Sequence, residues 1–107
     1  MPSSQIERKL AAIMFTDIAD YTALSAKDST KASELLTTQR DTLKPIVEKH
    51  GGSWMKEIGD GLLLTFDSAT SAVECSIAIQ EATKDIEDLN LRIGIEQLRI
   101  NEDVPRN

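Results

Sequence analysis

The sequence predicts an α+β domain with the ferredoxin-like order β-α-β-β-α-β, in which an antiparallel sheet carries both helices on one face. Three observations predict it. An apolar run at residues 10–15 indicates a strand, two segments carry apolar residues at helical spacing, and an Asp-Gly pair separates two apolar runs as in a β-hairpin. The length of 107 residues suits one domain over residues 1–107.

Residues 8–17 are expected to form the first strand. The near-continuous apolar run within it, LAAIMF, is typical of a central strand covered on both faces. Residues 18–27 then lead to a longer helix that begins near Asp28, where Ser, Thr and Asp provide N-cap side chains. Pro45 lies inside the helical pattern, so we expect it to kink the helix or to start a new turn. A Gly-Gly pair ends the helix.

A hairpin follows, with strands at residues 53–58 and 62–66. In a regular strand, Trp54, Lys56 and Ile58 share one face, which sets a lysine between two apolar residues. Either that face is exposed to solvent, or Lys56 points into a pocket or a partner's surface. An ammonium group only donates hydrogen bonds, so it suits a purine ring acceptor better than a donor edge.

The last third of the chain predicts a helix and a strand. Asp67 or Ser68 caps the helix, whose apolar positions recur by threes and fours over residues 72–89. Apolar and polar residues alternate over residues 91–95, which indicates a fourth strand. Residues 96–107 are mostly polar and are expected to form a tail, with a short edge strand at most.

Bulk properties exclude several classes of protein. The net charge of −6 argues against non-specific binding to nucleic acid or anionic membranes, although divalent cations can bridge an acidic domain to a polyanion. The longest apolar run is far too short to span a membrane, and the first five residues show no signal-peptide pattern. The single cysteine allows no internal disulfide and fits a reducing compartment. We expect a cytoplasmic protein with no nucleic-acid or membrane partner.

Two aspartates are candidates for metal binding. Asp17 ends the first strand, which lies beside the hairpin in the predicted sheet, so Asp17 and Asp60 are expected to approach each other. Adjacent carboxylates repel unless a cation lies between them, and paired aspartate oxygens suit Mg²⁺ together with substrate phosphates. In the alternative interpretation, Asp17 starts a helix and Asp60 serves only the turn. Spacing alone does not decide between them.

The segment DIADYT, from Asp17 to Thr22, turns from a strand into a helix. Free N–H groups at the start of a helix bind phosphate well, although any strand-to-helix turn shares this geometry. The remaining polar features are interpreted structurally, His50 as a helix-end residue and Cys75 as core. The acidic cluster is interpreted as a solvated helix face: Glu81, Asp85, Glu87 and Asp88. The sequence contains no zinc spacing, catalytic-triad order or Gly-rich phosphate loop.

Together, these segments resemble the catalytic domain of class III nucleotidyl cyclases, the adenylyl and guanylyl cyclases. FTDIADYT is similar to that family's first signature, GGSWMKEIGDGLLLTF to its second and LRIGI to the start of its third. The resemblance covers residues 8–95, the N-terminal part of such a domain, and leaves residues 96–107 as an atypical tail. The combination at these separations is specific, whereas each piece alone is weak.

The resemblance implies a role for each matched position. Asp17 and Asp60 match the family's two metal-binding aspartates, and the backbone carbonyl of Ile18 matches a further ligand to the second of two divalent cations, Mg²⁺ or Mn²⁺. Tyr21 and Thr22 match the turn that holds the triphosphate. The implied reaction is two-metal phosphoryl transfer, in which the ribose 3′-hydroxyl attacks the α-phosphorus and pyrophosphate leaves.

Lys56 matches the base-selecting lysine of adenylyl cyclases, where guanylyl cyclases usually carry a glutamate. The resemblance therefore implies ATP as the substrate and cyclic AMP as the product. Sites in the family form between two catalytic domains, so Asp17 and Asp60 would act with Lys56 of a partner. That partner would be a second copy in a homodimer or a complete cyclase domain.

The chain departs from the family after LRIGI. The family continues with His, then Gly and an acidic residue, whereas this chain continues with EQLRI. The resemblance places a second base-selecting residue, and the asparagine and arginine that stabilise the transition state, beyond this point. Loss of such donors costs roughly 10²–10³-fold each in other enzymes. We expect a shifted reading frame, a truncated gene product or a cloned fragment, with uncovered apolar surface that favours association or strand exchange.

Three functions fit the sequence. The first is an adenylyl cyclase-type domain. The second is a catalytically silent module that binds a metal-nucleotide complex or pairs with a complete cyclase. The third, a diguanylate cyclase, is disfavoured because that family carries Gly-Gly-Asp-Glu-Phe in its hairpin, where this chain has Gly-Asp-Gly-Leu.

Overall fold

The computed structural model describes residues 3–106, with side chains described for residues 11–99. The elements in chain order are β1 (Ser3–Ile18), α1 (Tyr21–Lys27), α2 (Ser29–Lys49), β2 (Ser53–Ile58), β3 (Gly61–Phe66), α3 (Ala69–Thr83) and β4 (Leu91–Arg106). The predicted order is confirmed, and the segment before the long helix adds the short helix α1. No helix among the described residues combines the length and apolarity needed to cross a membrane.

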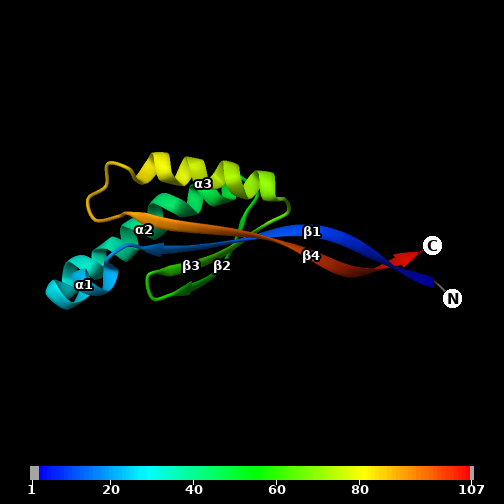
Figure 1. The fold of residues 1–107 in the computed structure, drawn as a ribbon, viewed down its shortest axis with the longest axis horizontal. Coiled ribbons are helices and arrows are strands. Elements are labelled where there is room, and N and C mark those ends of the chain that lie inside the picture. Colours follow the sequence, from blue (N-terminus) through cyan, green and yellow to red (C-terminus); the bar gives the residue numbers. More distant parts are fainter. Residues whose placement is uncertain (1–2, 107) are drawn as a thin grey trace.

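The strands form one antiparallel sheet in the order β2-β3-β1-β4. Figure 1 shows α2 and α3 packed on the same side of this sheet, as predicted. The pairing of β1 with β3 sets Met14 opposite Leu64 and Phe15 opposite Leu63. β1 therefore lies beside the hairpin, as the predicted topology requires.

Only one face of β1 is covered by the described elements, so the expectation that both faces are covered is wrong. Ala12 and Met14 are fully buried beneath the helices, whereas Phe15 is 48% exposed on the opposite face. We call this opposite side the open face of the sheet. Its apolar residues account for the unbroken apolar run in the sequence, although no described helix packs on them.

The long helix begins and ends near the predicted positions. The Asp28 carboxylate caps α2 by accepting a hydrogen bond from the Lys31 N–H at 3.0 Å. α2 continues through Pro45, so this proline starts no new helix. The helix ends at His50, and Gly51 follows with a φ of +71°, a left-handed conformation that glycine adopts without strain.

The second long helix is shorter than predicted. Ser68 caps α3 by accepting from the Ser71 N–H at 3.1 Å, but α3 ends at Thr83. The apolar pattern continues to Leu89 because this buried residue lies in the loop after the helix and still packs in the core. Asp88 has a φ of +66°, a left-handed conformation that a continuing helix excludes.

The expected polar tail is instead the second half of a long strand. β4 runs to Arg106 and pairs with β1 along its whole length, from Leu91 opposite Ile18 to Arg106 opposite Ser3. β3 pairs with β1 only from Ala12 onward, so the distal part is a two-stranded ribbon. The ribbon projects from the sheet (Figure 1) and gives the molecule its length of 62 Å.

A single core fills the space between the sheet and the helices. Its buried residues are Ala12, Met14, Ile18, Leu35, Leu43, Val47, Leu62, Leu64, Phe66, Ala72, Cys75, Ile79, Leu89 and Leu91.

Neighbouring residues of β1 should differ sharply in their contribution to stability. Met14→Ala removes a fully buried side chain, and we expect it to lower the free energy of unfolding by about 2–5 kcal/mol. Phe15→Ala, on the open face, should cost under about 1 kcal/mol. Urea unfolding of the two variants measures both values. Equal losses would contradict the one-sided core.

Candidate active site

Asp60 lies in the turn of the β2–β3 hairpin. Ile58 pairs with Gly61, so the turn consists of Gly59 and Asp60, one residue earlier than the predicted Asp-Gly pair. Gly59 has a φ of +59°, and a glycine with positive φ at the first position is typical of a type II′ turn, whose twist suits a hairpin. Asp60 therefore sits at the tip of the hairpin.

The tip of the hairpin is bound to the end of β1. The Ile18 N–H donates a hydrogen bond to Asp60 Oδ2 at 2.9 Å. Ile18 directly follows Asp17, so this bond holds the Asp60 carboxylate beside the residue that carries the other candidate carboxylate. A hydrogen bond between a charged group and a partly buried N–H is stronger than a neutral one.

The structure adds a cation that sequence reasoning missed. Arg92, on β4, lies opposite Asp17 in the sheet and donates from Nε to Asp17 Oδ1 at 2.6 Å. The pKa of the Arg92 guanidinium is raised, first by this hydrogen bond and the charge of Asp17, then by the charges of Asp20 and Asp60. Among these three carboxylates, Asp17 is the one that contacts the guanidinium. Because Arg92 is 71% exposed, the pair contributes little to stability.

The turn between β1 and α1 lies next to these carboxylates. Asp20 has a φ of +62°, and its side chain makes no capping hydrogen bond to α1. The first N–H groups of α1, at Tyr21 and Thr22, therefore receive no acceptor from the cap residue. The Tyr21 hydroxyl instead donates to the Ala32 carbonyl of α2 at 3.3 Å. The Tyr21 side chain thus fixes the turn to α2, and its backbone N–H is the group that remains available to a ligand.

Lys56 lies on the open face of the sheet. The expectation that Trp54, Lys56 and Ile58 share a face is wrong because the register shifts between Trp54 and Lys56, which leaves Met55 as a β-bulge. Trp54 pairs with the buried Leu64 on the helix side, whereas Lys56 pairs with Leu63 on the other side. Lys56 is exposed there.

A polar contact joins β2 to α2 on the helix side. Arg40 donates to the Glu57 carboxylate in a bidentate pair, at 3.0 Å from Nε and 2.8 Å from its terminal nitrogen. The Trp54 indole N–H donates to the same carboxylate at 3.3 Å, and the Lys44 ammonium lies 5.9 Å from the centre of the Trp54 ring. Arg40 chiefly, and Trp54 with it, lower the pKa of Glu57.

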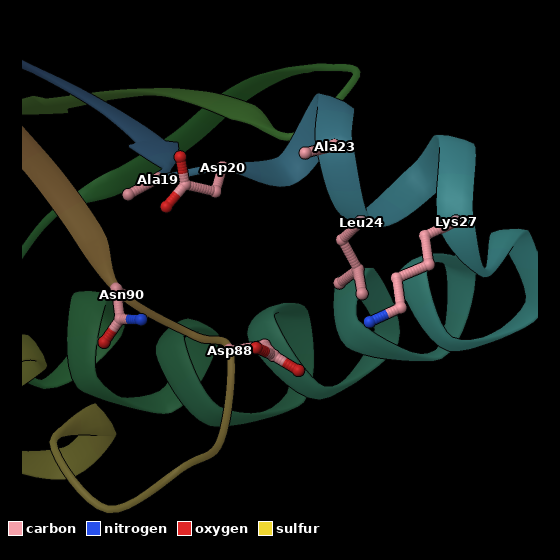
Figure 2. A pocket seen from close by; sticks show the side chains of 7 residues that line it. All are labelled: Ala19, Asp20, Ala23, Leu24, Lys27, Asp88 and Asn90. Atoms are coloured by element: carbon pink, nitrogen blue, oxygen red, sulfur yellow. The ribbon is translucent and has the colours of Figure 1, made fainter.

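A pocket of about 210 Å³ lies beside the candidate site. Figure 2 shows it between the β1–α1 turn, α1 and the loop that precedes β4, with Leu24 and Lys27 facing Asp88. Its lining residues are Ala19, Asp20, Ala23, Leu24, Lys27, Asp88 and Asn90. Among these lining residues, Asp20 is the one whose charge also raises the pKa of Arg92. Neither Asp17 nor Asp60 lines the pocket.

Two of the structural interpretations hold and one needs correction. His50 Nδ1 lies 2.9 Å from the Ile46 carbonyl at the end of α2, and burial raises the pKa of the Cys75 thiol to about 11. The acidic cluster does not follow one helix face, because α3 ends before three of its members. Two of these, Glu87 and Asp88, pair with Lys31.

The carboxylates fit divalent cations that also bind substrate. No group of three or more His, Cys, Asp or Glu side chains that could hold a metal occurs among the residues the structure describes. Asp17 is 45% exposed and already attracts a guanidinium, and its oxygens are of the hard type that Mg²⁺ and Mn²⁺ prefer. Mg²⁺ commonly binds through one or two carboxylates, with substrate phosphates as further ligands.

Known proteins match this chain over nearly its whole length. The family model described as the adenylate and guanylate cyclase catalytic domain matches residues 4–101, a wider range than the 8–95 expected. The putative adenylate cyclase 3 of Rhizobium meliloti (strain 1021) is 36% identical over 103 residues, which cover 89% of this chain. The matched part is 18% of that protein, so the chain spans about a fifth of its length.

Solved structures share the fold. The adenylyl cyclase CyaB from P. aeruginosa has a TM-score of 0.77 at 21% identity, over 94% of this chain and 66% of that one. A dimeric guanylyl cyclase domain of the RhoGC fusion protein from Blastocladiella emersonii has a TM-score of 0.77 at 24% identity, over 94% of this chain and 63% of that one. Both kinds of cyclase share this fold, so the fold does not select the nucleotide.

Asp60 should stabilise the fold through its acceptor oxygen. Asp60→Ala removes the acceptor of the Ile18 N–H, and we expect a loss of about 1–3 kcal/mol in the free energy of unfolding. Asp60→Asn keeps an acceptor at the same place and should lose less. Denaturant unfolding without divalent cations measures both, and equal losses would show that the hydrogen bond does not hold the hairpin.

The contact between α2 and β2 should weaken in acid. The pKa of Glu57 is lower in the folded chain, so the pair stabilises the fold fully above the ordinary glutamate pKa of about 4.3 and loses this effect as pH falls through the folded pKa. Trp54, the single tryptophan, reports the change by fluorescence. Glu57→Gln should abolish that transition, and a transition that survives in this variant would assign it to another group.

Proposed function

The chain belongs to the adenylate and guanylate cyclase catalytic-domain family, and we propose that it is an adenylyl cyclase-type domain that converts ATP into cyclic AMP and pyrophosphate. The observation that carries the proposal is the hydrogen bond from the Ile18 N–H to Asp60, which holds one carboxylate beside Asp17. Arg92 supplies the counter-charge at Asp17.

Asp17, Asp60 and the backbone carbonyl of Ile18 would hold two divalent cations, Mg²⁺ or Mn²⁺. When bound, these ions would activate the ribose 3′-hydroxyl for attack on the α-phosphorus and neutralise the leaving pyrophosphate. A cation held by Asp17 would compete with Arg92, whose guanidinium would then be free to contact an anion. Guanidinium groups suit phosphate oxygens because both present matched, paired hydrogen-bonding sites.

The β1–α1 turn would hold the triphosphate through its backbone. The N–H groups of Tyr21 and Thr22 begin α1, and the cap residue Asp20 leaves them without a side-chain acceptor. Such N–H groups suit a phosphate. The Tyr21 side chain fixes the turn against α2, so its role in binding would be indirect.

Lys56 would select adenine over guanine, and therefore ATP over GTP. Its ammonium only donates hydrogen bonds, and adenine offers ring acceptors where guanine offers N–H donors. Lys56 and Phe15 flank Leu63 in the sheet, two strand spacings or about 10 Å apart. The family's sites form between two catalytic domains, so we assign Lys56 to the site of a partner and not to that of its own chain.

The open face would form the contact with a second catalytic domain. It exposes the large apolar side chains of Phe15, Met55 and Ile58 around Lys56. Apolar surface of this kind marks a site of association. A homodimer would bring Lys56 of each chain to the carboxylates of the other, and a complete cyclase domain would do the same at one of the two sites.

A second candidate function is a silent module that binds a metal-nucleotide complex or pairs with a complete cyclase. The direction of β4 favours it. Residues 96–106 continue β4 away from Asp17 and toward Ser3, so this part of the described chain brings no donor to the reacting phosphate.

Incubation of the purified chain with ATP and Mn²⁺ separates the two functions. Adenylyl cyclase activity predicts cyclic AMP in the wild type and none above background in Asp17→Asn. ATP binding that depends on Asp17, without product, would instead support the silent module. No ATP binding in either protein would contradict the cyclase and the nucleotide-binding module, and would leave only pairing with a complete cyclase.

The choice of base is tested by Lys56→Glu. This change should lower the preference for ATP over GTP by about tenfold or more, because it replaces a charged donor by an acceptor. Lys49→Glu, an equal charge change at the exposed end of α2, is the matched control. An unchanged preference in Lys56→Glu would show that Lys56 does not read the base.

A further inference from the structure

The bulge at Met55 decides which way Lys56 points. Trp54 and Glu57 are three residues apart and would lie on opposite faces of a regular strand. In the structure both lie on the helix side, opposite Leu64 and Leu62, and they share a hydrogen bond at 3.3 Å. The extra residue makes this possible, and it leaves Lys56 on the open face.

Without the bulge, one end of β2 would be misplaced. If Trp54 kept its partner Leu64, a regular strand would set Lys56 opposite Leu62, on the side that α2 covers with Arg40 and Lys44. Like charges would then face each other, and Glu57 would turn away from Arg40. If Ile58 instead kept its partner Gly61, Trp54 would move to the open face. It would then lose its contact with the Lys44 ammonium and its hydrogen bond to Glu57.

The position of Arg40 makes the bulged register more favourable than the regular one that sets Lys56 opposite Leu62. Its guanidinium makes a bidentate pair with Glu57, and both side chains are partly shielded, at 42% and 34% exposure. The pair favours the bulged register and disfavours the one that brings Lys56 under α2. The Arg40–Glu57 pair on the helix side thus favours the orientation that puts Lys56 on the open face.

We propose that Arg40, Glu57 and Trp54 are positioning residues for nucleotide selection, because their contact holds the bulge that presents Lys56 to the base in the partner's site. The part that concerns the base depends on the proposed function, whereas the part that concerns the register does not. None of the three residues touches the nucleotide in this scheme.

The register is tested by cross-strand contacts in NMR spectra of Arg40→Gln and Glu57→Gln. The wild type should show Lys56 opposite Leu63. Each variant should lose this contact or add a contact of Lys56 with Leu62. The exchanged pair, Arg40→Glu with Glu57→Arg, should restore the wild-type pattern.

The matched control is Lys84→Gln, which removes an exposed pair with Glu81 on α3 and should leave the pattern unchanged. Wild-type contacts in both single variants would overturn the proposal.

Base selection is tested by competition of ATP and GTP for the same chains. Arg40→Gln should lower the ATP-to-GTP affinity ratio to within about twofold of Lys56→Ala, since both leave the base without a positioned ammonium. In the Lys56→Ala background, Arg40→Gln should change the ratio no further. A purely structural role would weaken both nucleotides equally and keep the ratio, which would overturn the proposal.

Failure of the proposed function has a different signature. If the wild type does not prefer ATP and Lys56→Ala changes nothing, Lys56 does not select the base. The cross-strand contacts then decide the positioning of Lys56 on their own. A shifted register in Arg40→Gln supports that positioning, and an unshifted register refutes it.

Discussion

The site depends on one hydrogen bond, from the Ile18 N–H to the Asp60 carboxylate. β1 ends where the chain turns into α1, and the hairpin tip reaches that point because β3 pairs with β1. The bond joins the two and holds the Asp60 carboxylate next to Ile18, the residue that follows Asp17. In the proposed function, a site fixed in this way would have little ordering cost when a cation or phosphate binds.

The two sides of the sheet carry different groups. Its helix side contains the core, the caps and the Arg40–Glu57 pair, whereas its open face carries Asp17, Arg92 and Lys56. The bulge in β2 connects the two sides, because in our proposal a contact on the helix side holds the orientation of Lys56 on the open face. A change on the helix side would then alter nucleotide selection without touching the open face.

Local sequence pattern predicted the elements and both ends of α2, but it missed the ends of α3 and β4 and the long-range contacts. Strand and helix periods, the Asp28 cap and the glycine stop at Gly51 come from interactions between near neighbours, and the structure confirms them. The bulge, in contrast, brings Glu57 to Arg40 of another element. Arg92 meets Asp17 only through the β1–β4 register, and the length of β4 depends on a partner strand at the other end of the chain.

The position of β4 has a consequence for how the chain associates. β4 lies at the edge of the sheet along all 16 of its residues, so no described strand pairs with its outer side. Two copies that met along this edge would merge into one continuous sheet, with their open faces side by side instead of opposed. Such a pairing would separate each Lys56 from the other chain's carboxylates. At high concentration, chains paired in this way would shield the backbone groups of β4, but they would not complete each other's proposed nucleotide site.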